Sequence, residues 1–144
     1  MSNDIIIEEL NTLLRGIYMG IRSMEHYIQK TTDDHLKEHF QSIQLEIKEN
    51  AQKLAEQIQD LGGIPADDEG FTGSIHSYMH NMMLPKDSDK ILTDAIKGME
   101  NYGVEYSEEL VKGDLDPESV RITKEIINTS RKHVNELKKL KKRL

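Results

Sequence analysis

The residues best suited to chemistry are two glutamates that recur in a repeated segment. Residues 21–27 read IRSMEHY and residues 96–102 read IKGMENY, so Glu25 and Glu100 hold the same place in two copies of one pattern. A weaker match aligns NAQKL, which starts at Asn50, with HVNEL, which starts at His133. The repeat predicts a duplicated helical hairpin in which Glu25 and Glu100 lie on opposite helices, at similar heights beside the core.

Apolar residues recur at steps of three and four along most of the chain, as they do in the packed helices of a bundle. Two glycines at 62–63 end one helix, Ser88 caps another, and Pro117 opens the last. We expect helices over about residues 4–30, 33–61, 74–84, 88–112 and 117–142. Two closely linked hairpins and a long crossover with its own short helix predict an all-α, ferritin-like four-helix bundle. We expect one domain over residues 1–144.

Composition excludes several classes of function. The chain has no cysteine, so it has no disulfide framework, thiolate metal site or cysteine nucleophile. It also lacks a glycine-rich phosphate loop, a nucleophile elbow and a His-Glu-x-x-His zinc motif. No apolar stretch approaches the roughly 20 residues that span a bilayer, and no signal peptide is recognisable, so we expect a cytoplasmic protein. The basic tail at 138–143 is typical of cations at a helix C-terminus, and we expect no nucleic-acid partner.

The chain resembles the ferritin-like superfamily and, within it, uncharacterised bacterial four-helix-bundle domains of unknown function that are distantly similar to rubrerythrins. The resemblance rests on the segment LNTLL from residue 10, the segment LGGIP from residue 61 and the segment GME from residue 98. Di-iron members of that superfamily take one glutamate from each of two helices and a Glu-x-x-His pair from each of the other two. The resemblance therefore implies a place for each metal ligand in this chain.

Only part of that ligand set is present. The resemblance puts Glu25 and Glu100 at the single glutamates and Asn50 and His133 at the histidines. It puts Ile47 and Ser130, which are poor metal ligands, at the two remaining glutamates. Without those carboxylates the chain lacks the negative charge that holds two divalent cations together, so a di-iron oxidase is disfavoured.

Two interpretations of the remaining polar residues stay open. Glu25, Glu100, His133 and Asn50 could hold one iron, manganese or zinc ion, or they could form a metal-free polar network that Tyr27 or Tyr102 joins. We favour the network, and therefore a bundle that is not an enzyme and that acts through self-association, as a homodimer, or through a protein partner. The alternative is an iron- or manganese-dependent oxidoreductase, or a protein that stores or carries metal.

The crossover segment offers a third set of candidate ligands. His76 and His80 are four residues apart, as are His35 and His39, a spacing that places two imidazoles on one face of a helix. Together with the methionines at 79, 82 and 83, the first pair could bind copper or zinc. We prefer the simpler interpretation, in which these methionines form an apolar face that packs on the bundle or binds a partner.

Overall fold

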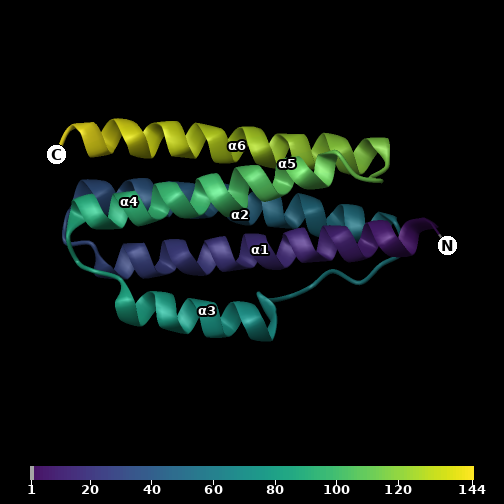
Figure 1. Ribbon diagram of the computed structural model, residues 1–144, viewed down its shortest axis with the longest axis horizontal. Helices are drawn as coiled ribbons and strands as arrows, with labels where there is room; N and C mark the ends of the chain where they lie inside the picture. The colour runs from purple at the N-terminus through teal and green to yellow at the C-terminus, as the bar shows by residue number, and fades with distance from the viewer. Residues whose placement is uncertain (1) are drawn as a thin grey trace.

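The computed structural model describes residues 2–144, and the side chains of all of these except residues 2, 71 and 72. The helices in chain order are α1 (Ser2–Lys30), α2 (Asp34–Asp60), α3 (Gly70–Met83), α4 (Ser88–Gly98), the π-helix η1 (Met99–Glu105), α5 (Tyr106–Val111) and α6 (Pro117–Lys142). α1 and α2 form one antiparallel hairpin, and the continuous run from α4 to α5 forms a second with α6 (Figure 1). The predicted all-α, ferritin-like bundle is therefore confirmed.

Helix ends follow from local hydrogen bonds. The Asp33 side chain accepts from two backbone N–H groups at the start of α2, and Asp116 caps α6 ahead of a proline in its first turn. α2 ends at Asp60, and Gly62 just beyond it has a φ of +90°, a conformation that favours glycine. The cap predicted at Ser88 is wrong by one residue, because the Asp87 carboxylate accepts from the Lys90 N–H and Ser88 is the first residue of α4.

The core consists of two apolar clusters at opposite ends of the bundle. One contains Tyr27 and Phe40, whose ring centroids lie 5.4 Å apart, together with Leu137 of α6. The other contains Leu10 of α1 and Ile58 of α2 and draws on the first half of α6. The middle of the bundle, between these clusters, is where small and polar side chains meet.

The second hairpin departs from a regular α-helix at this same level. The predicted helix over 88–112 forms, but residues 99–105 within it adopt π-helical geometry. A Cβ atom built on Gly103 would lie 3.0 Å from Ser130 Oγ, so the glycine allows η1 to approach α6 closely. Short π-helical segments inside α-helices are frequent at functional sites. The π-helix therefore makes the middle of the bundle a candidate functional site.

Candidate functional site

A cavity of about 580 Å³ lies in the middle of the bundle, and every helix contributes to its wall. It brings together Asn50 of α2 and His133 of α6, two of the predicted ligand residues. Ile47 and Ser130, which occupy the positions of the missing glutamates, line the same cavity. The methionines of the sequence repeat, Met24 and Met99, are also in the wall. The cavity wall therefore contains four of the six positions that the resemblance assigns to metal ligands.

His133 is held in one orientation by a carboxylate of α2 that the sequence analysis did not single out. Glu46 Oε2 lies 2.6 Å from His133 Nε2, and its Oε1 accepts from Lys132 Nζ at 3.0 Å. Burial raises the pKa of Glu46, but the hydrogen bonds from Lys132 and His133 lower it further, so the net pKa is below the ordinary value. An ionised carboxylate only accepts, so His133 Nε2 carries a proton. In the neutral imidazole, Nδ1 is then an acceptor, and it has no partner within residues 2–144.

The two repeated glutamates have partners away from this cavity. Glu25 accepts from Gln29 and, across to α2, from Gln44. Glu100 pairs with Lys138 at 3.4 Å on the surface of the second hairpin. Neither glutamate is among the residues that line the cavity. In the described part of the chain, no group of three or more histidine, aspartate or glutamate side chains is placed to hold a metal ion.

A second polar cluster, which the sequence did not predict, joins the crossover helix to the bundle. It consists of His26 and Tyr27 on α1, His80 on α3 and Asp94 on α4. His80 Nε2 donates to Asp94 Oδ2 at 2.6 Å, and its Nδ1 lies within hydrogen-bond distance of His26 Nδ1, at 3.1 Å. The Tyr27 hydroxyl donates to the same Asp94 oxygen at 2.5 Å. The prediction that Tyr27 joins a network of Glu25, Glu100 and His133 is therefore wrong.

The charges in this cluster are set by its hydrogen bonds. Burial raises the pKa of Asp94, yet the hydrogen bonds from His80 and Tyr27 more than offset it and hold the pKa below the ordinary value. Burial, and then the hydrogen bond to this carboxylate, raises the pKa of Tyr27. Asp94 is therefore an ionised acceptor shared by two donors, each from a different helix.

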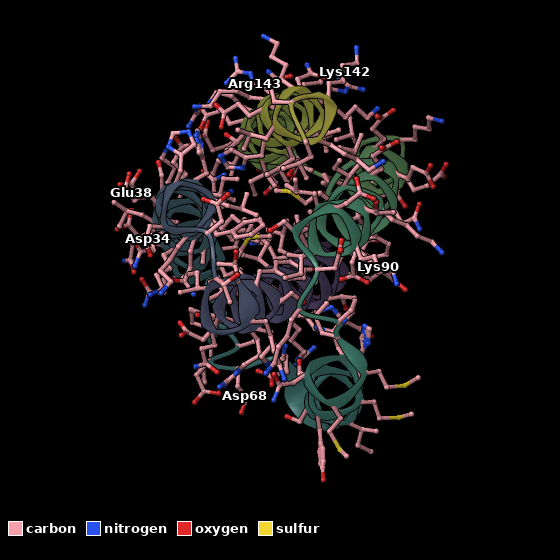
Figure 2. All side chains as sticks on the ribbon, turned by 90° about the vertical axis from the view of Figure 1, so that its left-hand side faces the viewer. Asp34, Glu38, Asp68, Lys90, Lys142 and Arg143 are labelled. Carbon is pink, nitrogen blue, oxygen red and sulfur yellow. The ribbon has the colours of Figure 1, made fainter. Side chains whose placement is uncertain are left out.

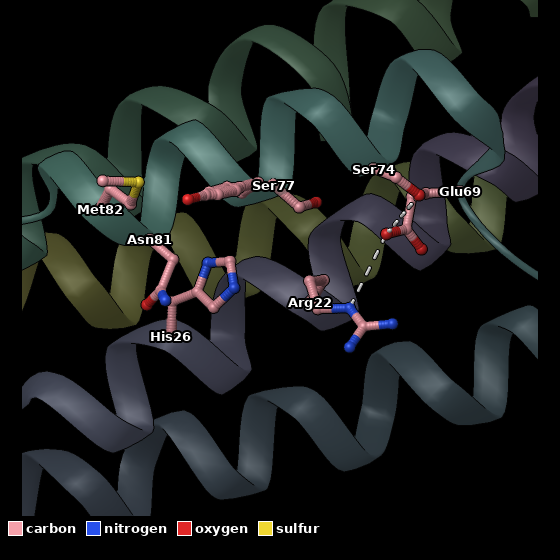
Figure 3. Close-up of a pocket in the computed structure, with 8 residues that line it drawn as sticks. Arg22, His26, Glu69, Ser74, Ser77, Asn81 and Met82 are labelled. Atoms are coloured by element: carbon pink, nitrogen blue, oxygen red, sulfur yellow. Dashed lines mark hydrogen bonds and ion pairs between the residues drawn. The ribbon is translucent and has the colours of Figure 1, made fainter.

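Beside the cluster, α1 and α3 enclose a smaller cavity of about 450 Å³ (Figure 3). An ion pair between Arg22 and Glu69, with 3.8 Å between Nε and Oε1, borders it together with His26. Ser77 and Asn81, both on α3, line it as well. On this side of α3 the His80 ring is hydrogen-bonded to His26, whereas Ser77 Oγ and Asn81 Oδ1 have no hydrogen-bond partner within residues 2–144.

The apolar face of α3 points the other way. Ile75, Tyr78, Met79, Met82 and Met83 are all exposed, the last to 78% of its surface. Figure 2 shows sulfur-tipped side chains extending from α3 away from the other helices. The prediction that these methionines pack on the bundle is therefore wrong, while the alternative of a partner-binding face stays a prediction. They also lie apart from His80, which faces α1 and α4.

Glu46, Asp94 and His26 are the residues that sequence reasoning missed. Glu46 precedes Ile47, and a step of one residue turns a side chain by about 100° around a helix, yet the Glu46 side chain is long enough to reach His133 across the hairpins. Asp94 and His26 belong to no motif, and they meet only because α3 lies against α1 and α4.

Comparison with known proteins gives the family. The model of the domain of unknown function DUF2383 matches residues 5–113, which is most of the chain. The chain belongs to this family. No curated protein sequence matches it. This agrees with the resemblance to ferritin-like domains of unknown function drawn from the sequence.

Two solved structures share the fold of this DUF2383 chain. One is a two-domain protein from Anabaena variabilis with DJ-1/ThiJ/PfpI-like and ferritin-like domains, at a TM-score of 0.78 and 21% identity. The match covers 97% of this chain but only 40% of that protein. The other is a dodecameric thioferritin, the bacterioferritin-related protein of Bacteroides fragilis, at a TM-score of 0.74 and 16% identity over 95% of this chain and 84% of that one. At these identities the likeness establishes the ferritin-like fold.

Between residues 2 and 144, no helix is both long enough and apolar enough to cross a bilayer.

Proposed function

We propose that this protein acts through association, and that the exposed face of α3 is the surface by which one copy binds another. The observation that carries this proposal is the reversed polarity of α3, whose polar side faces the bundle while five large apolar residues face outward. Contiguous exposed apolar surface on a small protein usually marks an interaction site. The stripe follows the i, i+3, i+4, i+7 spacing by which one helix packs on another.

The composition of α3 supports an interface rather than a solvated helix. Residues 70–83 include no Asp, Glu, Lys or Arg, although charged residues make up 31% of the chain. Interface centres are depleted in charge and enriched in methionine and tyrosine, which together provide four of the five exposed residues. Two copies could pair through α3 about a twofold axis, because one apolar stripe is complementary to another. The dodecameric assembly of the thioferritin, a protein of the same fold, is consistent with association of this bundle.

Replacing Met79, Met82 and Met83 together with glutamine is expected to convert the associated protein to monomer. Glutamine keeps the length and helix propensity of methionine but removes the gain from burying apolar surface. Because these side chains are exposed in the isolated chain, the thermal stability of the monomer should change little. Sedimentation velocity over a range of protein concentrations measures the oligomeric state directly.

The matched control is Leu45→Gln, which removes an exposed apolar residue of α2 from a surface remote from α3. This variant should associate like the wild type. A wild-type protein that sediments as a monomer at high micromolar concentration would rule out self-association through α3. Unchanged association of the triple variant would place the interface elsewhere.

The donor set does not fit a di-metal centre. Ile47 and Ser130 stand in the cavity where carboxylates are needed, and Glu25 and Glu100 are engaged with other partners. Only His133 keeps a feature of metal-binding histidines, a carboxylate that fixes the ring through its other nitrogen. One imidazole and the Asn50 amide are too few ligands for tight binding of iron, manganese or zinc.

We therefore expect purified protein to contain much less than one equivalent of iron, manganese or zinc. Elemental mass spectrometry after dialysis against each ion gives the content, and Glu100→Ala and His133→Ala provide the comparison. Stoichiometric metal that is lost in both variants would instead support the residual site of Glu25, Glu100, His133 and Asn50. An oxidoreductase or metal carrier would then become the better assignment.

A further inference from the structure

The central cavity has the size and the wall of a binding site for a small organic molecule. Its volume of about 580 Å³ lies within the range of roughly 300–1,000 Å³ that small-molecule sites occupy. Ile17, Met24, Met99 and Ile126 supply apolar surface from three sides. The cavity contacts both core clusters, so a bound molecule would bridge the two halves of the bundle.

Glycines keep this space open. Gly16 and Gly20 on α1 and Gly98 on α4 all line the cavity, and a Cβ built on any of them would meet no atom within 4 Å. A glycine inside a helix costs about 0.5–1 kcal/mol relative to alanine. Three such positions along one cavity therefore carry a cost in stability that packing against neighbouring residues does not explain.

Two buried polar atoms in the wall point to a ligand. His133 and Ser107 are 1% and 0% exposed, and neither His133 Nδ1 nor Ser107 Oγ has a hydrogen-bond partner within residues 2–144. Unpaired polar groups in a protein interior are costly, so each such atom calls for a partner. His133 Nδ1 accepts a hydrogen bond and the Ser107 hydroxyl can donate or accept, which are the complements of a hydroxyl or an amide.

The charges around the cavity argue against an ionic ligand. The Glu46 carboxylate pairs with Lys132 and accepts a hydrogen bond from His133, Glu69 pairs with Arg22, and Asp94 accepts from His80 and Tyr27. Arg15 and Lys97, the basic residues of the wall, are exposed and lie at its rim. An ion taken into the centre would lose its hydration without gaining a counter-charge. We propose that the cavity binds an uncharged organic molecule with an apolar body and a hydroxyl or amide group.

The test uses the uncharged dye N-phenyl-naphthylamine, whose fluorescence rises in apolar surroundings. Wild-type protein should bind one dye per chain saturably, and decanol should displace it more effectively than decanoate. Gly20→Leu and Gly98→Leu fill the cavity from two different helices, and each should weaken dye binding by about tenfold or more. Ser107→Ala should weaken displacement by decanol several-fold, because it removes a polar partner inside the cavity.

Two controls separate this cavity from other apolar surface. Gln52→Leu adds a leucine on the exposed face of α2 and should leave dye binding unchanged. The Met79, Met82 and Met83 triple variant should also bind dye normally, so the result is independent of association through α3. Circular dichroism checks that each variant is folded. If Gly20→Leu or Gly98→Leu does not fold, Gly16→Leu takes its place. Dye binding that survives both filling variants, is lost in the methionine variant, or is displaced better by decanoate would overturn the proposal.

Discussion

Replacing Asp94 with alanine is expected to lower the free energy of unfolding by about 2 kcal/mol and to loosen α3 from the bundle. The Asp94 carboxylate accepts from the buried Tyr27 hydroxyl and from His80, and hydrogen bonds to a charged group are among the stronger ones. Alanine would leave a buried phenol without its acceptor. The side chain of Asp94 is 41% exposed, which keeps the expected loss below that of a fully buried pair.

Urea denaturation gives the change in free energy, and amide hydrogen exchange over residues 70–83 reports on α3. The matched control is Asp89→Ala on the same helix, where the lost partner is Lys141 at 3.7 Å on the surface. Exposed pairs of this kind contribute less than about 1 kcal/mol, and exchange in α3 should not change. Equal effects of the two substitutions would show that the Asp94 cluster does not hold α3.

Acidification from pH 7.5 to pH 5 is expected to destabilise the contact between α1 and α3. Burial, the neighbouring His80 and then Arg22 lower the pKa of His26 from its ordinary value of 6.5, with Lys30 acting in the same direction and Glu25 opposing them. Because the folded pKa is the lower one, the unfolded chain binds the proton more readily. The stabilisation is present above pH 6.5 and is lost as the pH falls through the folded pKa.

The hydrogen bond between the imidazoles explains why this loss is local. Protonation of His26 would create a charged ring whose Nδ1 lies 3.1 Å from Nδ1 of His80, which disfavours the contact between α1 and α3. Hydrogen exchange in α3 should therefore accelerate at pH 5 while exchange in α6 stays slow. His26→Gln should reduce this pH dependence, whereas His35→Gln, at an exposed position of α2, should not. Identical pH profiles for all three proteins would contradict the assignment.

The bundle could be predicted from the sequence because the features that define each helix are local. Apolar periodicity, the Asp33 and Asp116 caps and the Gly62 turn are local features, and local features survive in any fold that buries the stripes. The π-helix was not predictable in this way. Its geometry depends on the approach of Gly103 to Ser130, which are distant in sequence and neighbours only in the folded chain.

The candidate site was predicted in part, for a related reason. Aligning the two repeats identified Asn50 and His133, since positions that face the centre of a bundle repeat with the helix period. The contact of Glu46 with His133 and the cluster around Asp94 depend on side chains that extend from one helix to another. The apolar periodicity of a sequence does not predict such contacts. The prediction for the orientation of α3 was wrong for a different reason: we assumed that its apolar face is buried, whereas the inward side carries His80, which is hydrogen-bonded to His26 and Asp94.

The polar attachment of α3 has a consequence for the order of folding. Hydrophobic collapse can join α1, α2 and the second hairpin through the two core clusters without any contribution from the methionines of α3. Hydrogen bonds such as that between His26 and His80 need their helices already in place, so they form only after collapse. α3 is therefore expected to dock last and to open first, as a separate cooperative unit. Until it docks, a newly made chain leaves the central cavity open along the wall that His76 and His80 later cover.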